Sequence, residues 1–246
     1  MSELSSKSAG RSMRRLAFAL LVAGLSSATA LPASASCEDS PKAGVDWSRC
    51  LKINMKLQDR DLQGAKLVGA NLTNSDLSGA NLTGADLTGA ILVRTWLVEA
   101  LLTEANLTKA LLARANMAKA DLSEAVAMKA ELHRADLRNA VLTNANLEKA
   151  EFGRAILRGA DLSGAILRDT DLSRADLRGA RFAGAELTDA DLYRADLRGA
   201  DLAGAVGLKQ EQLDGSCGDE TTALPEGLQV PAAWPCGTRE DGDEED

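Results

Sequence analysis

The feature that most constrains this fold is a leucine that returns at every fifth position. Stepping by five from Leu57 to Leu202 gives 30 pentapeptides, and 26 of them have Leu at this position. The exceptions are Met117, Ala127, Phe152 and Phe182. A helix repeats its faces about every 3.6 residues and a strand every two, so a period of five fits neither. Each pentapeptide must therefore be one structural step of its own.

A second regularity lies two residues before each of these positions. Alanine stands there in 25 of the 30 pentapeptides, and the residue between the two is often Asp or Asn. The residues found there instead of alanine are Met55, Arg60, Ser75, Thr95 and Thr170. An apolar residue two places after a small one fits an extended step in which both point inward. The remaining, mostly polar residues then point outward.

The resulting pattern, A-(D/N)-L-x-x, resembles the pentapeptide repeat family. The stretch 192–205, "LYRADLRGADLAGA", shows it plainly, and the resemblance extends without a break over residues 55–205. It implies an all-β fold, a right-handed quadrilateral parallel β-helix in which four pentapeptides make one coil. About 7.5 coils would stack, with leucines inside and small caps at both ends.

The first 35 residues predict a secretory signal peptide. Arg11, Arg14 and Arg15 precede an apolar run at 16–25, and Ala33-Ser34-Ala35 has the small-x-small pattern of a cleavage site. We expect cleavage after Ala35, with Ala30 as the alternative, and a periplasmic or secreted protein exported by the Sec route. The apolar run is too short for a bilayer span, so no stable membrane anchor is expected after cleavage.

The four cysteines, Cys37, Cys50, Cys217 and Cys236, flank the repeat in pairs. An oxidising compartment permits disulfides, and the local pairs Cys37–Cys50 and Cys217–Cys236 are favoured because a rigid rod would separate the two ends. Zinc binding is the competing interpretation. It fails on spacing, because the chain has no C-x-x-C and its one histidine, His133, lies within the repeat.

The flanks therefore predict caps on the repeat. Residues 36–54 would form an N-terminal cysteine loop in which Trp47 packs over the first coil. Residues 206–246 would form a C-terminal cap, with a short helix like the one that ends members of the family, a second cysteine loop and an acidic tail.

Charge tests one known role of the family, protection of DNA gyrase by imitation of duplex DNA. The chain has a net charge of −8. By segment the charge is +3 for residues 1–54, −2 for 55–205 and −9 for 206–246. A mimic of a polyanion should concentrate negative charge along the rod, whereas here the charge lies in the tail. An exported protein would also not meet gyrase, so no nucleic-acid-related partner is predicted and this role stays the alternative.

If a coil has 20 residues, arginines stack in two columns. The first contains Arg94, Arg114, Arg134, Arg154, Arg174 and Arg194, and the second Arg138, Arg158, Arg178 and Arg198. Carboxylate columns run beside them, namely Glu131, Glu151, Asp171 and Asp191 on one side and Asp136, Asp176 and Asp196 on the other. A stabilising salt-bridge lattice is the favoured interpretation. The alternative is an array of guanidinium groups that faces an anionic ligand or partner.

A cluster of apolar residues stands at outward positions, which we name the apolar patch: Ile91, Val93, Trp96, Val98, Leu101 and Leu111. A contiguous exposed patch of this kind commonly marks an interface, here with another protein or a second copy. The alternatives are that a terminal segment folds over the patch, or that the repeat simply tolerates these residues.

No feature of the sequence indicates an enzyme. A convex rod with a leucine core offers no cleft for catalytic groups, His133 is isolated, and no metal-ligand or cofactor motif occurs. No catalytic, metal or cofactor site is therefore predicted. The sequence favours an exported, non-catalytic scaffold that binds an unknown protein partner or itself. A cytoplasmic, DNA-mimicking regulator of gyrase is the alternative.

Overall fold

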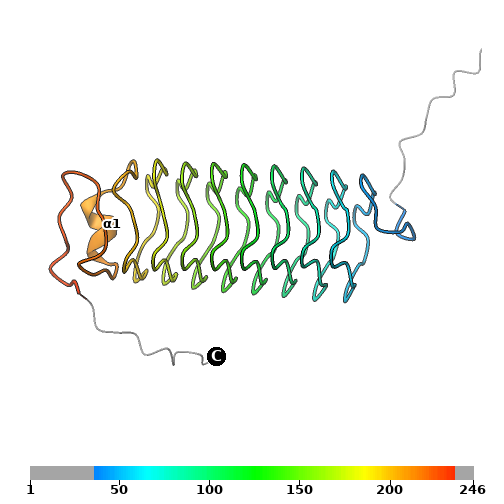
Figure 1. Ribbon diagram of the computed structural model, residues 1–246, viewed down its shortest axis with the longest axis horizontal. Coiled ribbons are helices and arrows are strands. Elements are labelled where there is room, and N and C mark those ends of the chain that lie inside the picture. Colours follow the sequence, from blue (N-terminus) through cyan, green and yellow to red (C-terminus); the bar gives the residue numbers. More distant parts are fainter. Residues whose placement is uncertain (1–35, 236–246) are drawn as a thin grey trace, which may run out of the picture. The chain divides into compact units, whose positions relative to one another are not determined.

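The computed structural model describes residues 36–235. The predicted signal peptide, Cys236 and most of the acidic tail lie outside the described residues. Residues 36–235 form a stack of coils that ends beside a short helix, α1 (Gln210–Asp214) (Figure 1).

The coils are held in register by parallel β-bridges between residues 20 positions apart. These bridges run from Asp46–Lys66 to Glu186–Val206 and recur at every fifth residue. Four pentapeptides therefore complete one coil, and each forms one wall of a four-sided parallel β-helix. Every wall contributes one bridge residue to the ladder rather than a long strand.

Each pentapeptide has five positions with fixed roles, as residues 61–65 illustrate. Asp61 is the bridge residue, Leu62 the inner residue, Gln63 and Gly64 the first and second turn residues, and Ala65 the corner residue. Leu62 and Ala65 are fully buried. These fixed roles explain the period of five, because only the inner and corner side chains of each pentapeptide enter the core.

Four of the five backbone N–H groups bond to backbone carbonyls. In residues 66–70, Lys66 N–H donates to Val45 in the preceding coil, and Leu67 and Gly69 donate to the following coil. Ala70 N–H closes the turn by donating to the carbonyl oxygen of Leu67, at 2.9 Å. The N–H of the first turn residue has no backbone acceptor in this scheme.

The Asp or Asn of the motif supplies the missing acceptor. At all 17 bridge positions from 46 to 201 that carry Asp or Asn, Oδ1 accepts a hydrogen bond from the N–H of the first turn residue. Such local bonds are the reason that Asp and Asn favour turns. The Asp or Asn of the motif therefore satisfies a backbone N–H group that has no backbone acceptor. An apolar bridge residue cannot accept this hydrogen bond.

We expect Asn106→Ala to lower the free energy of unfolding by about 1 kcal/mol, the usual worth of one hydrogen bond. Asn106 Oδ1 accepts from Thr108 N–H at 3.0 Å. Asn106→Asp keeps the acceptor and should cost much less. Urea denaturation followed by circular dichroism measures both, and equal losses would contradict this role for the side chain.

The second turn residue is left-handed throughout. At every fifth position from Gly44 to Gly199, φ lies between 54° and 70°. Glycine adopts this conformation freely, whereas other residues are disfavoured there by roughly 1–2 kcal/mol. All six arginines of the first column occupy such positions.

The stack begins two pentapeptides before residue 55, where the sequence pattern begins. Trp47 and Lys52 occupy inner positions, and the Cys37–Cys50 disulfide joins the preceding loop to the first coil. The Trp47 indole N–H donates to the Asp39 carbonyl oxygen at 3.1 Å. Lys52 lies over the indole ring and donates to the Cys37 carbonyl oxygen at 2.6 Å. Part of the predicted N-terminal cap is thus a closed coil.

The C-terminal end closes differently. Bridges continue past residue 205, to Asp196–Cys217 and Asp201–Ala223, and α1 lies in the segment before Cys217. The Gln212 side chain of α1 donates to the carbonyl oxygens of Leu187 and Ala190. Both ends of the ladder are therefore covered, which protects edges that would otherwise pair with other chains. Cys217 is disulfide-bonded, and the pairing predicted with Cys236 stays a prediction.

Candidate functional site

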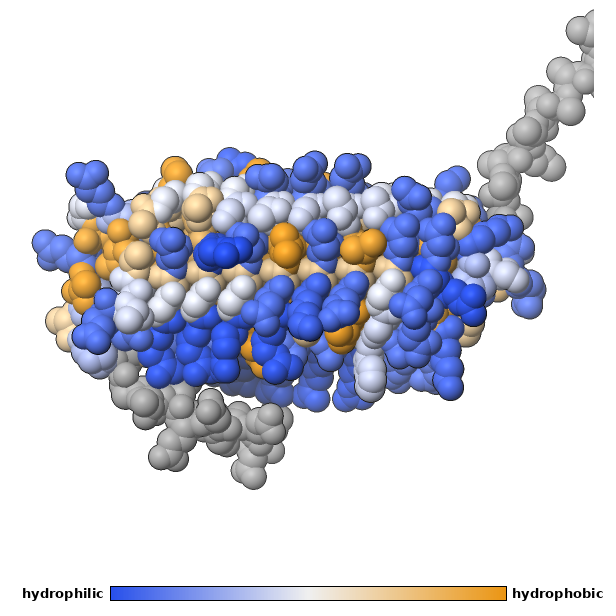
Figure 2. Space-filling model, viewed as in Figure 1, coloured by the Kyte–Doolittle hydropathy of each residue, from blue (hydrophilic) through white to orange (hydrophobic). Residues whose placement is uncertain are grey.

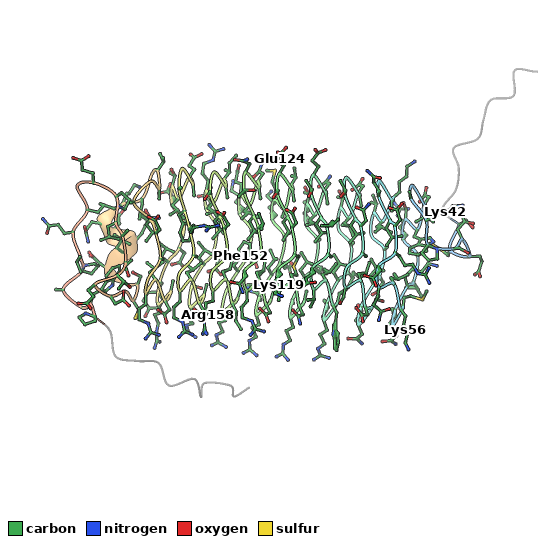
Figure 3. All side chains as sticks on the ribbon, viewed as in Figure 1. Lys42, Lys56, Lys119, Glu124, Phe152 and Arg158 are labelled. Carbon is green, nitrogen blue, oxygen red and sulfur yellow. A yellow bond between two sulfur atoms is a disulfide. The ribbon has the colours of Figure 1, made fainter. Side chains whose placement is uncertain are left out.

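The four walls give the stack four faces, each named here by its column of bridge residues. Face 1 runs from Asp46 to Val206, face 2 from Leu51 to Asp191, face 3 from Lys56 to Asp196 and face 4 from Asp61 to Asp201. Apolar residues stand singly among polar ones on the face in Figure 2. Figure 3 shows Arg158 at the surface and Phe152, which is fully buried, inside the stack.

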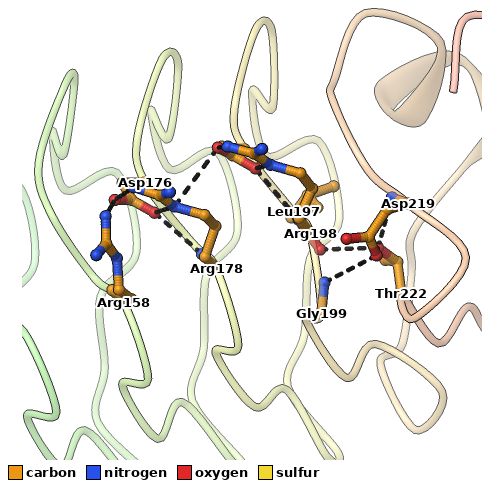
Figure 4. A network of polar contacts seen from close by, with 9 residues as sticks. Arg158, Asp176, Arg178, Leu197, Arg198, Gly199, Asp219 and Thr222 are labelled. Atoms are coloured by element: carbon orange, nitrogen blue, oxygen red, sulfur yellow. Dashed lines mark hydrogen bonds and ion pairs between the residues drawn. The ribbon is translucent and has the colours of Figure 1, made fainter. Parts of the chain in front are cut away.

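On face 3 the second arginine column is paired with carboxylates. Arg158 and Arg178 contact Asp176 at 2.9 and 2.8 Å, and Arg178 also reaches Asp196 at 3.6 Å (Figure 4). Arg198 contacts Asp196 at 2.6 Å. Arg138 contacts Asp136 in the same way, three coils before Arg198. This arrangement is the salt-bridge lattice expected from the sequence.

The pKa values of several carboxyl groups in the stack are shifted by their surroundings, some downward and one upward. Burial raises the pKa of Asp136, but the hydrogen bonds and charge of Arg138 outweigh it, so the pKa lies below its ordinary value. The same balance lowers the pKa of Asp161, through Ser163 and Arg181. At Asp176 burial dominates and raises the pKa. Most of the carboxyl groups whose pKa is shifted are therefore stabilised in their charged form by the folded stack.

We expect the stack to lose stability as the pH falls below about 4. A carboxylate whose folded pKa is lowered binds protons less readily when folded, so its contribution is present above 3.8 and lost as the pH falls through the folded pKa. Asp176 acts in the opposite direction. Urea midpoints at pH 6 and pH 3 measure the effect, and Asp161→Asn should reduce the difference. Equal midpoints in the unmodified protein would contradict this expectation.

Face 2 carries the first arginine column, which differs from the second column in its ion pairing. In the described part of the chain, Arg94, Arg114, Arg154 and Arg174 make no ion pair. Among the carboxylates of the same face, Glu151 contacts His133 at 2.7 Å. Glu131, Asp171 and Asp191 make no ion pair with any residue in 36–235. The compensation expected beside this column is therefore not formed at Arg94, Arg114, Arg154 and Arg174 within residues 36–235.

An open hollow of about 490 Å³ separates the two columns. Arg154 and Arg174 line one side, Asp171 and Asp191 the other, and the short residues Gly153 and Ser173 lie between them. His133 and Tyr193 also line it. Since a guanidinium and a carboxylate column face the same hollow without meeting, the site can bind a surface that offers both charges.

The apolar patch is divided among three faces. Ile91, Val93 and Leu111 lie on face 2, with Ile91 and Leu111 bridged on adjacent coils. Trp96 and Val98 lie on face 3, and Leu101 lies on face 4. Trp96 and Leu101 are 57% and 46% exposed.

Face 2 has two further apolar residues that the sequence pattern did not single out. Leu51 and Ile53 lie at its N-terminal end and are 76% and 42% exposed. Extending the register of 20 residues back from Ile91 would have placed Leu51 on this face. The apolar residues of face 2 thus lie in its N-terminal half, beside Arg94 and Arg114, and its carboxylates lie in its C-terminal half.

Neither a metal-binding cluster nor a membrane-spanning helix occurs in the part of the chain that the structure describes. Residues 36–235 bring together no group of three His, Cys, Asp or Glu side chains able to hold a metal ion. No helix in this range has the length and hydropathy needed to span a bilayer. The exposed His133 lies beside Glu151 at one end of the hollow.

Among solved structures, the chain is 34% identical to HetL, a pentapeptide repeat protein involved in heterocyst differentiation regulation in Nostoc sp. strain PCC 7120, over 75% of this chain and 85% of HetL (TM-score 0.48). It is 19% identical to QnrB1, a plasmid-mediated fluoroquinolone resistance protein, over 73% of this chain and 91% of that one (TM-score 0.36). A pentapeptide repeat protein of the Arabidopsis thaliana thylakoid lumen is 25% identical over 41% of this chain and 70% of its own (TM-score 0.30). No curated protein matched the chain.

The sequence profile for pentapeptide repeats matches in eight copies, within 57–94, 97–134, 105–144, 135–174 and 170–206. These matches cover more than half of the chain and coincide with the stacked coils. The chain therefore belongs to the pentapeptide repeat family.

Proposed function

We propose that this protein is an exported, non-catalytic scaffold that presents face 2 to a protein partner. The observation that carries the proposal is the contrast between faces 2 and 3. On face 3 the arginines and carboxylates satisfy one another, as in Arg198–Asp196 at 2.6 Å. On face 2, Arg154 and Arg174 line a hollow together with Asp171 and Asp191, and these four residues make no ion pair within residues 36–235.

The arginines of face 2 also stand where folding alone would favour glycine. Arg94, Arg114, Arg154 and Arg174 have φ between 55° and 60°. On face 3 the equivalent second turn positions in the last coils are Gly159, Gly179 and Gly199. Arginine costs roughly 1–2 kcal/mol more than glycine in this conformation. Residues such as Lys109 and Glu99 adopt the same conformation on other faces, so what distinguishes face 2 is an arginine at this position in six successive coils.

The apolar half of face 2 supports a protein partner. Leu51, Ile91 and Leu111 are bridge residues that forgo the hydrogen bond that Asp or Asn would accept there. Aliphatic side chains beside unpaired guanidinium groups are typical of protein–protein interfaces. Because acidic and basic columns alternate around the stack, it does not present the continuous negative surface that imitation of DNA would need. A protein partner is thus favoured over the gyrase alternative.

Export is supported by the cysteine chemistry. The Cys37–Cys50 disulfide closes the first coil directly after the predicted signal peptide, and structural disulfides persist in oxidising compartments. A rigid, disulfide-closed rod suits the periplasm or the extracellular space.

Two measurements test this function. Fractionation with N-terminal sequencing should find a chain that begins near residue 36 in the exported fraction, and a full-length cytoplasmic chain would contradict export. In pull-downs from that fraction, Ile91→Asp should lose a partner identified by mass spectrometry. Val141→Asp, at an apolar bridge position on face 4, should retain it. Equal retention by both variants would remove face 2 as the binding surface.

A further inference from the structure

We propose that face 2 binds the same face of a second copy, with the two stacks side by side and parallel. This inference rests on the proposed function, because it takes face 2 as the interaction surface and names its partner. The starting observation is that face 2 carries both charges in separate columns, so it can be complementary to itself.

Face 2 presents three columns in a fixed order. The bridge column includes Glu131, Glu151, Asp171 and Asp191, and the second-turn column holds the six arginines of the first column. Between them run the first turn residues, which include Gly153 and Ser173 at the hollow. The middle column is therefore short at Gly153 and Ser173, between the larger side chains of His133 and Tyr193.

A twofold axis along the middle column sets the two copies parallel. Each residue then meets the partner residue at the same level but on the opposite side of the axis, as an isologous contact requires. Glu151 would face the partner's Arg154, and Asp171 would face the partner's Arg174. By symmetry every such contact occurs twice. Asp171, Arg154 and Arg174, which make no ion pair within residues 36–235 of one copy, would then be paired in the dimer, and Glu151 would contact the partner's Arg154 in addition to His133.

The antiparallel alternative does not have this property. A twofold axis across the stack brings each column opposite itself, so that arginines face arginines and carboxylates face carboxylates. Like charges opposed in an interface are strongly unfavourable. The charge pattern therefore selects the parallel arrangement.

The apolar half of the face fits the same arrangement. Ile53 and Val93 belong to the middle column, so they would meet their own copies at the axis. Ile91 and Leu111 would lie against the aliphatic stems of the partner's Arg94 and the partner's Arg114. From Leu51 to Asp191 the contact would extend over seven coil steps of about 4.8 Å each.

A charge-exchange cycle tests the pairing by sedimentation of the purified protein. The unmodified protein should sediment as a dimer. Glu151→Arg and Arg154→Glu should each weaken the dimer by roughly tenfold or more, since like charges then face each other. The double variant exchanges the two charges and should restore the dimer. Glutamate is tolerated at this turn position, because Glu99, Glu104 and Glu124 already adopt it.

Matched controls reverse charges away from face 2. Glu124→Arg and Lys129→Glu change exposed residues that make no ion pair within 36–235, and both should leave the dimer unchanged. A protein that sediments as a monomer at all concentrations would overturn the proposal. Failure of the double variant to recover, with its circular dichroism spectrum intact, would do the same.

Cysteine cross-linking tests the parallel orientation independently. Thr73→Cys and Ser173→Cys lie in the middle column, five coils apart. In a parallel dimer each should form a disulfide with its own copy, whereas an antiparallel dimer permits at most one of them. A monomer whose Ile91→Asp variant still loses a captured partner would reject the dimer and keep the proposed function. If the protein is a dimer but is not exported and captures no other protein, the dimer is kept and the proposed function is rejected.

Discussion

Phe152→Ala is expected to lower the free energy of unfolding by about 3–5 kcal/mol, the usual cost of removing a buried aromatic ring. Phe152 is a fully buried inner residue, and its ring fills space between coils that have only one inner side chain on each wall. A neighbouring leucine cannot move into the gap without breaking its own bridge register. The substitution should therefore leave a cavity in the middle of the stack.

Urea denaturation followed by circular dichroism measures this effect. Tyr193→Ala is the matched control, because Tyr193 is an aromatic residue that is 56% exposed, and its loss should change stability by less than about 0.5 kcal/mol. If the two variants lost equal stability, the inner position would not carry the core.

Removal of the Cys37–Cys50 disulfide is expected to cost about 3 kcal/mol, the chain-entropy value for a loop of this size. The two cysteines are 13 residues apart, and the disulfide holds the loop whose carbonyl groups bind Trp47 and Lys52. Without it the first coil would open and expose the edge of the ladder.

The variant for this test is Cys37→Ser with Cys50→Ala, since alanine is the usual corner residue. Its urea midpoint should fall, and added reductant should lower the midpoint of the unmodified protein at least as far. An unchanged midpoint in the variant would show that the indole and ammonium contacts close the coil without the disulfide.

The sequence predicted the stack itself because one physical rule, small and apolar residues at fixed inward positions, repeats from Leu57 to Leu202. The same rule did not predict the coils at the two ends of the stack. At the first coil the inner residues are Trp47 and Lys52, which hide the pattern although the register of 20 residues continues. At the last coil the bridges join residues 21 and 22 positions apart: one extra residue lies in the segment that contains α1, and a second lies between Cys217 and Ala223.

The columns of the candidate site could be predicted, but their pairing could not. Asp136 and Arg138 lie two positions apart. They are the bridge residue and the first turn residue of the same pentapeptide, and their side chains form an ion pair. Asp171 and Arg174 lie three positions apart, which places the arginine at the second turn position; both line the hollow and they make no ion pair within residues 36–235. A difference of one position in the spacing of Asp and Arg thus decides whether the two side chains form an ion pair or stay unpaired. Only the turn geometry reveals this difference.

The most direct test of the fold is a cross-link between residues that the stack makes neighbours. Ser123 and Thr143 lie 20 positions apart on face 4, and the Thr143 hydroxyl donates to the Ser123 hydroxyl at 3.0 Å. Ser123→Cys with Thr143→Cys should form a disulfide within one molecule under mild oxidation, because adjacent coils lie about 4.8 Å apart. Ser123→Cys with Ser163→Cys, two coils apart, should not. Cross-linking of the second pair but not the first would contradict a coil of four pentapeptides.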